Sequence, residues 1–216
     1  MAKPKTTIAE QIAAAQVAVN NSLEDSEIKV LVAEYGYTAE KLIEGKELFM
    51  AAQAAVSVQE QASGAQQAAT EEFKTAQAAA TDAYQALSKV ARAAAPKSAL
   101  AGLGLTGPMP RSTAAFQTAA RSLFTNAASL PTLAEYGYTS AKLQAETAKL
   151  DAFDEANRRQ EAAKGAAQQA TRDQDAALAA LNKWLAQYIK IARVALRTKR
   201  ELLEKLGVAV RAASAA

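Results

Sequence analysis

The five-residue segment Glu-Tyr-Gly-Tyr-Thr occurs twice in this chain, as Glu34–Thr38 and again as Glu135–Thr139. The offset of 101 residues then holds without a gap, and about 25 of the 64 aligned pairs from residue 32 to residue 95 are identical. About 11 of these pairs are Ala, which is common throughout the chain, but the paired tyrosines and glycines are not explained by composition. The sequence therefore predicts a tandem duplication.

The composition predicts an all-α fold. Half of the 216 residues are hydrophobic, but Ala dominates them and aromatic residues make up only 6%. Ala, Gln, Glu, Lys, Leu and Arg all favour helices, and only nine Gly and five Pro interrupt them. Because an Ala methyl group contributes less on burial than a Leu or Phe side chain, we expect a thin, tightly packed core.

The chain contains no Cys and no His, which excludes disulfides, thiolate nucleophiles, Ser-His catalysis and most zinc sites. The sequence contains no nucleophile–base pair that we recognise, so we expect a protein that is not an enzyme and that carries no cofactor or metal. No apolar run follows the basic start Met1–Lys5, and no window approaches the ~18 apolar residues of a membrane span. We therefore expect no signal peptide, no membrane span and a cytoplasmic location.

Each copy of the repeated segment is typical of a corner between two helices. Gly36 suits the left-handed position after a helix, Tyr37 the contact back onto its last turn, and Thr38 the N-cap of the next helix. We expect both tyrosine rings to pack in this corner; phenols lining a ligand site are the alternative. The preceding helix is predicted from Thr6 or Thr7 to Tyr35, with 20–22 as the place where it bends or stops.

Two long helices follow the corners, over residues 39–95 and 140–196, each with an apolar stripe at coiled-coil spacings of three and four. Gly64 and Gly165 lie near their centres, and Thr171–Gln174 fits a capping box, so a turn in each helix is the alternative. We favour continuous helices, because a single Gly costs only about 1 kcal/mol in a helix. In that arrangement Gly64 and Gly165 permit close approach where the long helices cross.

The predicted fold is an elongated up-and-down four-helix bundle, built from a short helix, a corner and a long helix, twice. It forms a single domain over residues 1–216, with internal repeats 6–95 and 112–196. Pro96 ends the first long helix, residues 96–111 form the connecting loop, and Ser112 caps the next short helix. Residues 197–216 are a C-terminal extension, in which 202–206 adds a helical turn before Gly207, and 212–216 form a frayed tail.

The charges favour an antiparallel arrangement of the long helices. Residues 24–82 carry 11 acidic and 4 basic side chains, whereas residues 183–211 carry 8 basic and 2 acidic ones. Antiparallel packing would place the acidic start of the first long helix beside the basic end of the second. The pairs expected to face each other are Glu40, Glu44 and Glu47 on one side and Lys190, Arg193 and Arg197 on the other.

The candidate interaction surface is a basic set at the end of the second long helix: Lys190, Arg193, Arg197, Lys199 and Arg200. Such a set can contact phosphates, but the net charge is only +3 and no set of aromatic residues for stacking RNA bases accompanies it. The other interpretations are a solvated or internally paired face and a surface for an acidic protein.

Two other groups of residues have an alternative interpretation. Asp151, Asp154 and Glu155, with Asp173 and Asp175, could hold a hard cation but are more typical of solvated carboxylates on a helix. Trp184 and Tyr188 lie on the core stripe, with a cofactor site as the alternative.

The duplicated corner, the Gln-x-x-Ala-x-Gly centre and the ending Ile191–Leu196 with Leu202–Gly207 resemble an uncharacterised family of bacterial helical-bundle proteins. The resemblance spans roughly residues 33–208 and implies a bacterial all-α bundle, but no activity. We therefore predict a non-enzymatic structural or protein-interaction bundle, with a homodimer or another protein as partner. Nucleic-acid binding through the basic C-terminal helix is the alternative.

Overall fold

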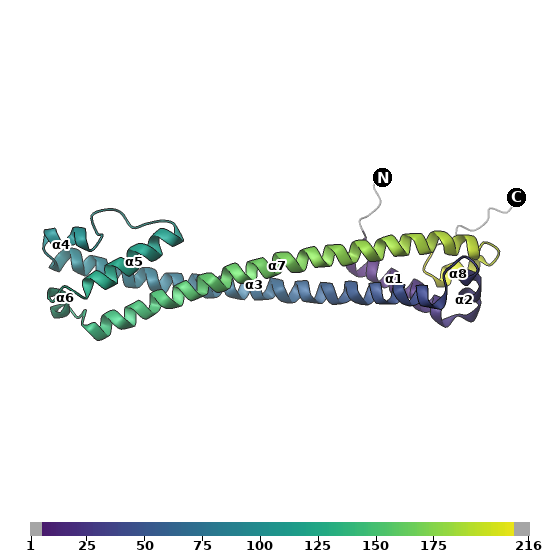
Figure 1. The fold of residues 1–216 in the computed structure, drawn as a ribbon, viewed down its shortest axis with the longest axis horizontal. Coiled ribbons are helices and arrows are strands. Elements are labelled where there is room, and N and C mark those ends of the chain that lie inside the picture. Colours follow the sequence, from purple (N-terminus) through teal and green to yellow (C-terminus); the bar gives the residue numbers. More distant parts are fainter. Residues whose placement is uncertain (1–5, 210–216) are drawn as a thin grey trace. The chain divides into compact units, whose positions relative to one another are not determined.

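The computed structural model describes residues 6–209, and every regular element in that range is a helix (Figure 1). The predicted all-α class is confirmed. In chain order, the helices are α1 (Ile8–Glu24), α2 (Ser26–Ala33), α3 (Ala39–Ala94), α4 (Lys97–Gly102), α5 (Thr113–Ala127), α6 (Thr132–Glu135), α7 (Ser140–Ala195) and α8 (Arg200–Lys205). The tail predicted over 212–216 lies outside the described residues.

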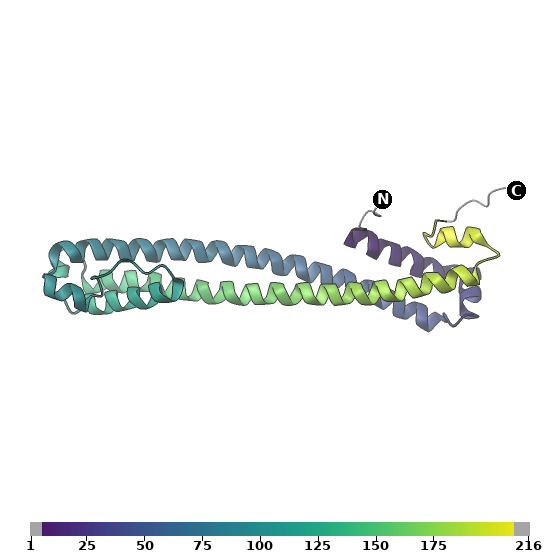
Figure 2. The same ribbon diagram turned by 90° about the horizontal axis from the view of Figure 1, so that it is seen from above.

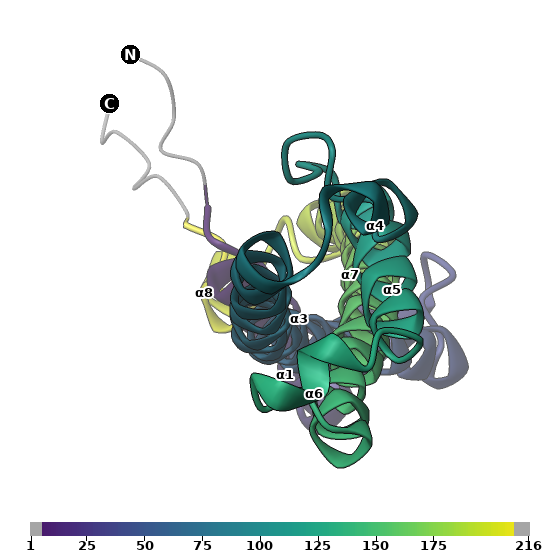
Figure 3. The same ribbon diagram turned by 90° about the vertical axis from the view of Figure 1, so that its left-hand side faces the viewer.

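The chain divides into two compact units. Unit 1 comprises residues 1–62 and 167–216, and it contains α1, α2, α8, the first part of α3 and the last part of α7. Unit 2 comprises residues 63–166 and contains α4, α5, α6 and the remaining parts of α3 and α7. In unit 2, α4, α5 and α6 gather beside the two long helices (Figure 3). Both boundaries between the units lie inside long helices, close to Gly64 and Gly165.

The first predicted helix is interrupted, but at Asp25 rather than at residues 20–22. Thr7 caps α1 in a reciprocal capping box with Glu10, and the helix runs on to Glu24. The Asp25 carboxylate then accepts hydrogen bonds from the backbone N–H groups of Glu27 and Ile28, which starts α2. The predicted break was wrong because Asn21 and Ser22 bond to other segments: Asn21 to the Lys205 carbonyl and Ser22 to Tyr188.

The two corners adopt the same backbone geometry. Gly36 has φ +84° and Gly137 has φ +86°, as predicted for the left-handed position. The N–H of Tyr37 donates to the Val32 carbonyl (3.1 Å), and that of Tyr138 donates to the Leu133 carbonyl (3.0 Å). The expectation that both rings pack was wrong. The second tyrosine of each corner is buried or half-buried, whereas the first, Tyr35 or Tyr136, is exposed.

Both long helices are continuous, as favoured from the sequence. α3 passes through Gly64 and α7 through Gly165 without a turn, and Thr171–Gln174 caps nothing. The expected close approach at these glycines was wrong, because a Cβ added at either would meet no other atom within 4 Å. The close approach occurs at Gly45, where a Cβ would lie 2.3 Å from Cη2 of Trp184.

Prolines and glycines set the ends of the shorter elements. α3 ends at Ala94, before Pro96, but the predicted loop 96–111 was wrong in its first part, which forms α4. Pro96 has no N–H, so it fits the position before the first turn of α4. The predicted Ser112 cap is confirmed, because its Oγ accepts from the Ala115 N–H. The predicted turn after residue 200 is α8, and Gly207 follows it with φ +73°.

Each unit has its own core. In unit 2, Phe116 and Phe153 pack with their ring centroids 5.8 Å apart, among leucines from α5, α6 and α7. In unit 1, Tyr37 and Tyr188 pack beside Leu196 and the α8 leucines. Figure 2 shows α8 on the same side of this unit as α1. The long helices thus pack closely in both units, and short helices complete each core.

Candidate functional site

The predicted basic set lies around the junction of α7 and α8 in unit 1. Lys190 and Arg193 are on α7, Arg197 follows its last residue, Lys199 precedes α8, and Arg200 begins it. All of these side chains are exposed except that of Lys199, which is half-buried. The sequence therefore located a basic exposed surface, but its members do not all have the same role.

Two of the five basic side chains hold α2 rather than facing a partner. The Arg197 guanidinium donates to the Tyr35 hydroxyl (3.0 Å) and to the Val194 carbonyl (3.3 Å). Lys199 pairs with Glu27 in the first turn of α2. Since exposed contacts of this kind contribute at most about 1 kcal/mol each, they orient the junction more than they stabilise it.

A further contact, not predicted from the sequence, joins α8 to the start of α2. The Lys205 ammonium lies 2.7 Å from Asp25 Oδ2, and the Asp25 carboxylate also caps α2. The hydrogen bond from Lys205, followed by that from the Ile28 backbone, lowers the pKa of Asp25 below its ordinary value. The sequence gives no signal that places these two residues, 180 positions apart, next to each other.

The ion pairs expected between the long helices are not formed. Within residues 6–209, none of the Glu40, Glu44 and Glu47 carboxylates lies within ion-pair distance of Lys190, Arg193 or Arg197. Glu40 instead binds the Thr38 hydroxyl at the start of α3, which lowers its pKa. The expectation was wrong because charge totals along a sequence do not specify which side of each helix carries them. Lys190 and Arg193 are thus left with no ion pair among the described residues.

Exposed apolar side chains are concentrated in unit 1. Among the described residues, nine large hydrophobic side chains are exposed, and all except Tyr136 belong to unit 1. The eight members in unit 1 are Ile8, Val17, Val30, Tyr35, Ile43, Met50, Val58 and Val194. Single exposed hydrophobic residues are normal on any protein, so only those that lie on one side of the same helix bear on association.

Part of this surface forms a stripe along α3, which we call the α3 stripe and define as Ile43, Met50 and Val58. At about 100° per residue, these positions fall within about 80° of the helix circumference. Met50 is 54% exposed and Val58 is 55% exposed. Leu42 and Phe49, on the other side of the helix, are buried in the core of unit 1. α3 therefore has a covered apolar face in unit 1 and, on another side, three exposed apolar residues with the exposed Glu47 inside the same arc.

The aromatic group Tyr37, Trp184 and Tyr188 is part of the core, as expected. Trp184 stacks on Tyr188 with centroids 5.2 Å apart, and Tyr37 meets the edge of Trp184 at 5.8 Å. Tyr188 is fully buried, and its hydroxyl is hydrogen-bonded to Ser22. Burial, opposed by that bond, raises the pKa of Tyr188 to about 12. A phenol with so high a pKa stays protonated at neutral pH, so its role here is packing.

Three of the carboxylates considered for a cation bind arginines of the same unit. Arg121 on α5 lies 2.8 Å from Asp151 Oδ1 and also pairs with Asp154, while the Gln117 amide donates to Asp154 (2.7 Å). Hydrogen bonds from Arg158 and Arg159 lower the pKa of Glu155. Within the described residues, no group of three or more acidic side chains is placed to hold a metal.

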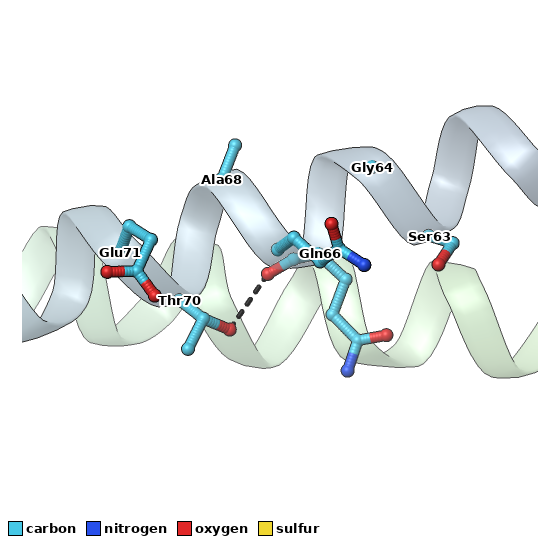
Figure 4. Close-up of a pocket in the computed structure, with 7 residues that line it drawn as sticks. Ser63, Gly64, Gln66, Ala68, Thr70 and Glu71 are labelled. Atoms are coloured by element: carbon cyan, nitrogen blue, oxygen red, sulfur yellow. Dashed lines mark hydrogen bonds between the residues drawn. The ribbon is translucent and has the colours of Figure 1, made fainter.

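A hollow of about 650 Å³ lies against α3 in unit 2 (Figure 4). All of its lining residues come from one helix, and the Thr70 hydroxyl is already bonded to the Gln66 carbonyl at 2.8 Å. It is therefore an open depression, formed partly because Gly64 has no side chain. The lining residues are Ser63, Gly64, Gln66, Gln67, Ala68, Thr70 and Glu71.

Comparisons with known protein families, curated proteins and solved structures identify no relative of this chain. No protein-family model matches the chain, and neither a curated protein nor a solved structure is similar to it. Within residues 6–209, none of the helices combines the length and the apolar character that crossing a membrane requires.

Proposed function

We propose that this protein is a non-enzymatic helical bundle that acts by binding protein, in the first place a second copy of itself, through the exposed apolar face of unit 1. The observation that carries the proposal is that, within residues 6–209, all but one of the exposed large hydrophobic side chains belong to this unit. The α3 stripe belongs to this face; the exposed Glu47 lies within its arc, and the exposed Lys46, of opposite charge, flanks it. An association through such a surface depends on apolar burial and so resists salt.

Analytical ultracentrifugation at low and high salt tests this proposal. The wild-type chain is expected to sediment as a dimer whose dissociation constant changes little with salt. Met50→Gln removes apolar surface at an exposed helix position and is expected to weaken the dimer at least tenfold, whereas Ala152→Gln on the exposed surface of unit 2 should not. A wild-type chain that stays monomeric at high concentration, or a dimer that Met50→Gln leaves unchanged, would contradict the proposal.

Nucleic-acid binding remains the second candidate, because Lys190 and Arg193 are exposed and form no ion pair within the described residues. Phosphate contacts by these side chains would release counterions, so affinity would fall steeply with salt. The opposite salt dependence separates this candidate from apolar self-association.

We also propose that the two halves arose by tandem duplication and that α3 and α7 run antiparallel as a coiled-coil pair. α3 and α7 both have 56 residues and begin 101 positions apart, and both corners have the same backbone hydrogen bonds, which supports duplication. Leu42 shares a cluster with Tyr188, while Phe49 further along α3 shares one with the earlier Leu181, which supports an antiparallel order. The bacterial origin and cytoplasmic location stay predictions.

A further inference from the structure

A groove of about 710 Å³ opens in unit 1, where the first half of α1 faces α3 and α7. Its apolar walls include Ile8, Ile12 and Val56. Ile8 is also one of the exposed hydrophobic residues of the unit. Grooves of roughly 300–1,000 Å³ with apolar walls and a few polar groups are typical of small-molecule sites.

The polar groups of this groove are amides. Gln16, Gln53, Gln59 and Gln174 all line it, and none of their side chains is hydrogen-bonded within the described residues. Gln174 is the unusual one, because it is only 8% exposed. Because its amide is not hydrogen-bonded and is not among the fully buried polar atoms, it is accessible from the groove and can form a hydrogen bond with a ligand.

The offset of the repeats shows why unit 1 has space at this point. Phe73 and Phe153 of unit 2 pack with their ring centroids 5.4 Å apart. At an offset of 101 residues, the corresponding positions of unit 1 hold Gln174 and Ala52. Two phenyl rings are thus replaced by an amide and a methyl group. Gln174, which corresponds to Phe73, borders the groove in unit 1.

We propose that this groove binds an uncharged amphiphile, with its apolar body between α1 and Val56 and a hydrogen-bonding head at the Gln174 amide. The size of the groove suits a drug-sized molecule with one or two rings. An amide both donates and accepts, so it can pair with an amine, hydroxyl or carbonyl group. Among the described residues that line the groove, none is Lys or Arg, and the Glu60 carboxylate disfavours an anion.

Two dyes with one skeleton test this inference. N-phenyl-1-naphthylamine is uncharged, and 8-anilinonaphthalene-1-sulfonate adds a sulfonate to the same rings. We expect saturable, one-to-one binding of the neutral dye to the wild-type chain, detected by the increase in its fluorescence, and binding of the sulfonate at least tenfold weaker. Equal affinity for both dyes, or no saturable binding of the neutral one, would overturn the inference.

Three single substitutions, each compared with the wild-type chain, test whether the neutral dye binds in this groove. Ala13→Trp is at an exposed position of α1 that lines the groove. The indole fills the groove and is expected to weaken binding of the neutral dye more than tenfold. Gln174→Leu keeps the size but removes the amide, so it should weaken binding roughly three- to tenfold. Ala152→Gln, on the exposed surface of unit 2, should change the affinity less than twofold. Unchanged affinity in Ala13→Trp, with native circular dichroism, would place the dye elsewhere and refute the inference.

Discussion

Gly45 is the position at which a single methyl group tests the packing of unit 1. A Cβ at this residue would lie 2.3, 2.5 and 2.7 Å from three atoms of the Trp184 ring. The ring cannot easily move aside, because it stacks on Tyr188 and meets Tyr37 edge-on. Overpacking of this kind costs about 1–3 kcal/mol. The higher helix propensity of Ala offsets about 1 kcal/mol of this cost.

Gly45→Ala is therefore expected to lower the free energy of unfolding by about 0–2 kcal/mol. Gly64→Ala and Gly165→Ala introduce the same methyl group where no other atom lies within 4 Å, so each should raise it by about 1 kcal/mol. Urea unfolding followed by far-UV circular dichroism measures all three. The gain in helix propensity is the same for the three Gly→Ala changes. The difference between their effects on the free energy of unfolding therefore reports the steric effect at Gly45.

A double-mutant cycle attributes that difference to the indole ring. In a Trp184→Leu background the obstruction is gone, and Gly45→Ala should then stabilise the chain by about 1 kcal/mol, as at the open positions. If Gly45→Ala stabilises the wild-type chain as much as Gly64→Ala does, the ring does not constrain this site and the reasoning is refuted.

Three further predictions concern charge and pH. The raised pKa of Tyr188 contributes about 3 kcal/mol to the free energy of unfolding, fully present below about pH 10 and lost as the pH rises towards about 12. Tyr188→Phe should therefore make the free energy of unfolding, followed by circular dichroism, less dependent on pH in the alkaline range. The ionised Asp25 carboxylate stabilises the folded chain at pH values above the ordinary pKa of Asp, and this contribution is lost as the pH falls through the lower pKa of the folded state. Asp25→Asn should therefore lower the urea midpoint more at pH 7 than at pH 3. If the chain binds nucleic acid, Lys190→Gln with Arg193→Gln should reduce the slope of log affinity against log salt by roughly 2, and an unchanged slope would exclude these side chains.

Local rules in the sequence predicted several of the helix ends correctly. Thr7 and Ser112 cap helices, Gly36 and Gly137 take the left-handed conformation, and Pro96 follows the end of α3. These features depend on neighbours within a few residues, so propensity and capping chemistry suffice to find them.

Contacts between distant segments were not predictable in the same way. Asn21 and Ser22 were interpreted as a weak point in a helix, because their partners, the Lys205 carbonyl and Tyr188, lie far along the chain. The close approach at Gly45 could not be predicted either, because the Trp184 ring that lies against it comes from a distant part of the chain.

The candidate site shows the same limit. The basic residues were identified as a set, but which of them face solvent depends on α2, whose acidic first turn engages Lys199. The groove at Gln174 had no signal of its own, since this residue fitted a capping box that the continuous α7 does not use. The only sequence clue was its alignment with Phe73, and that becomes informative once the Phe73–Phe153 pair is seen.

Cysteine trapping tests the central claim, self-association through the α3 stripe, most directly. The chain has no native Cys, so a single introduced thiol reports one position only. Met50→Cys is expected to form a covalent dimer rapidly on mild oxidation at low protein concentration, at the same rate in low and high salt. Ala152→Cys, exposed on unit 2, is the matched control and should dimerise slowly. Equal rates for the two variants would contradict the account.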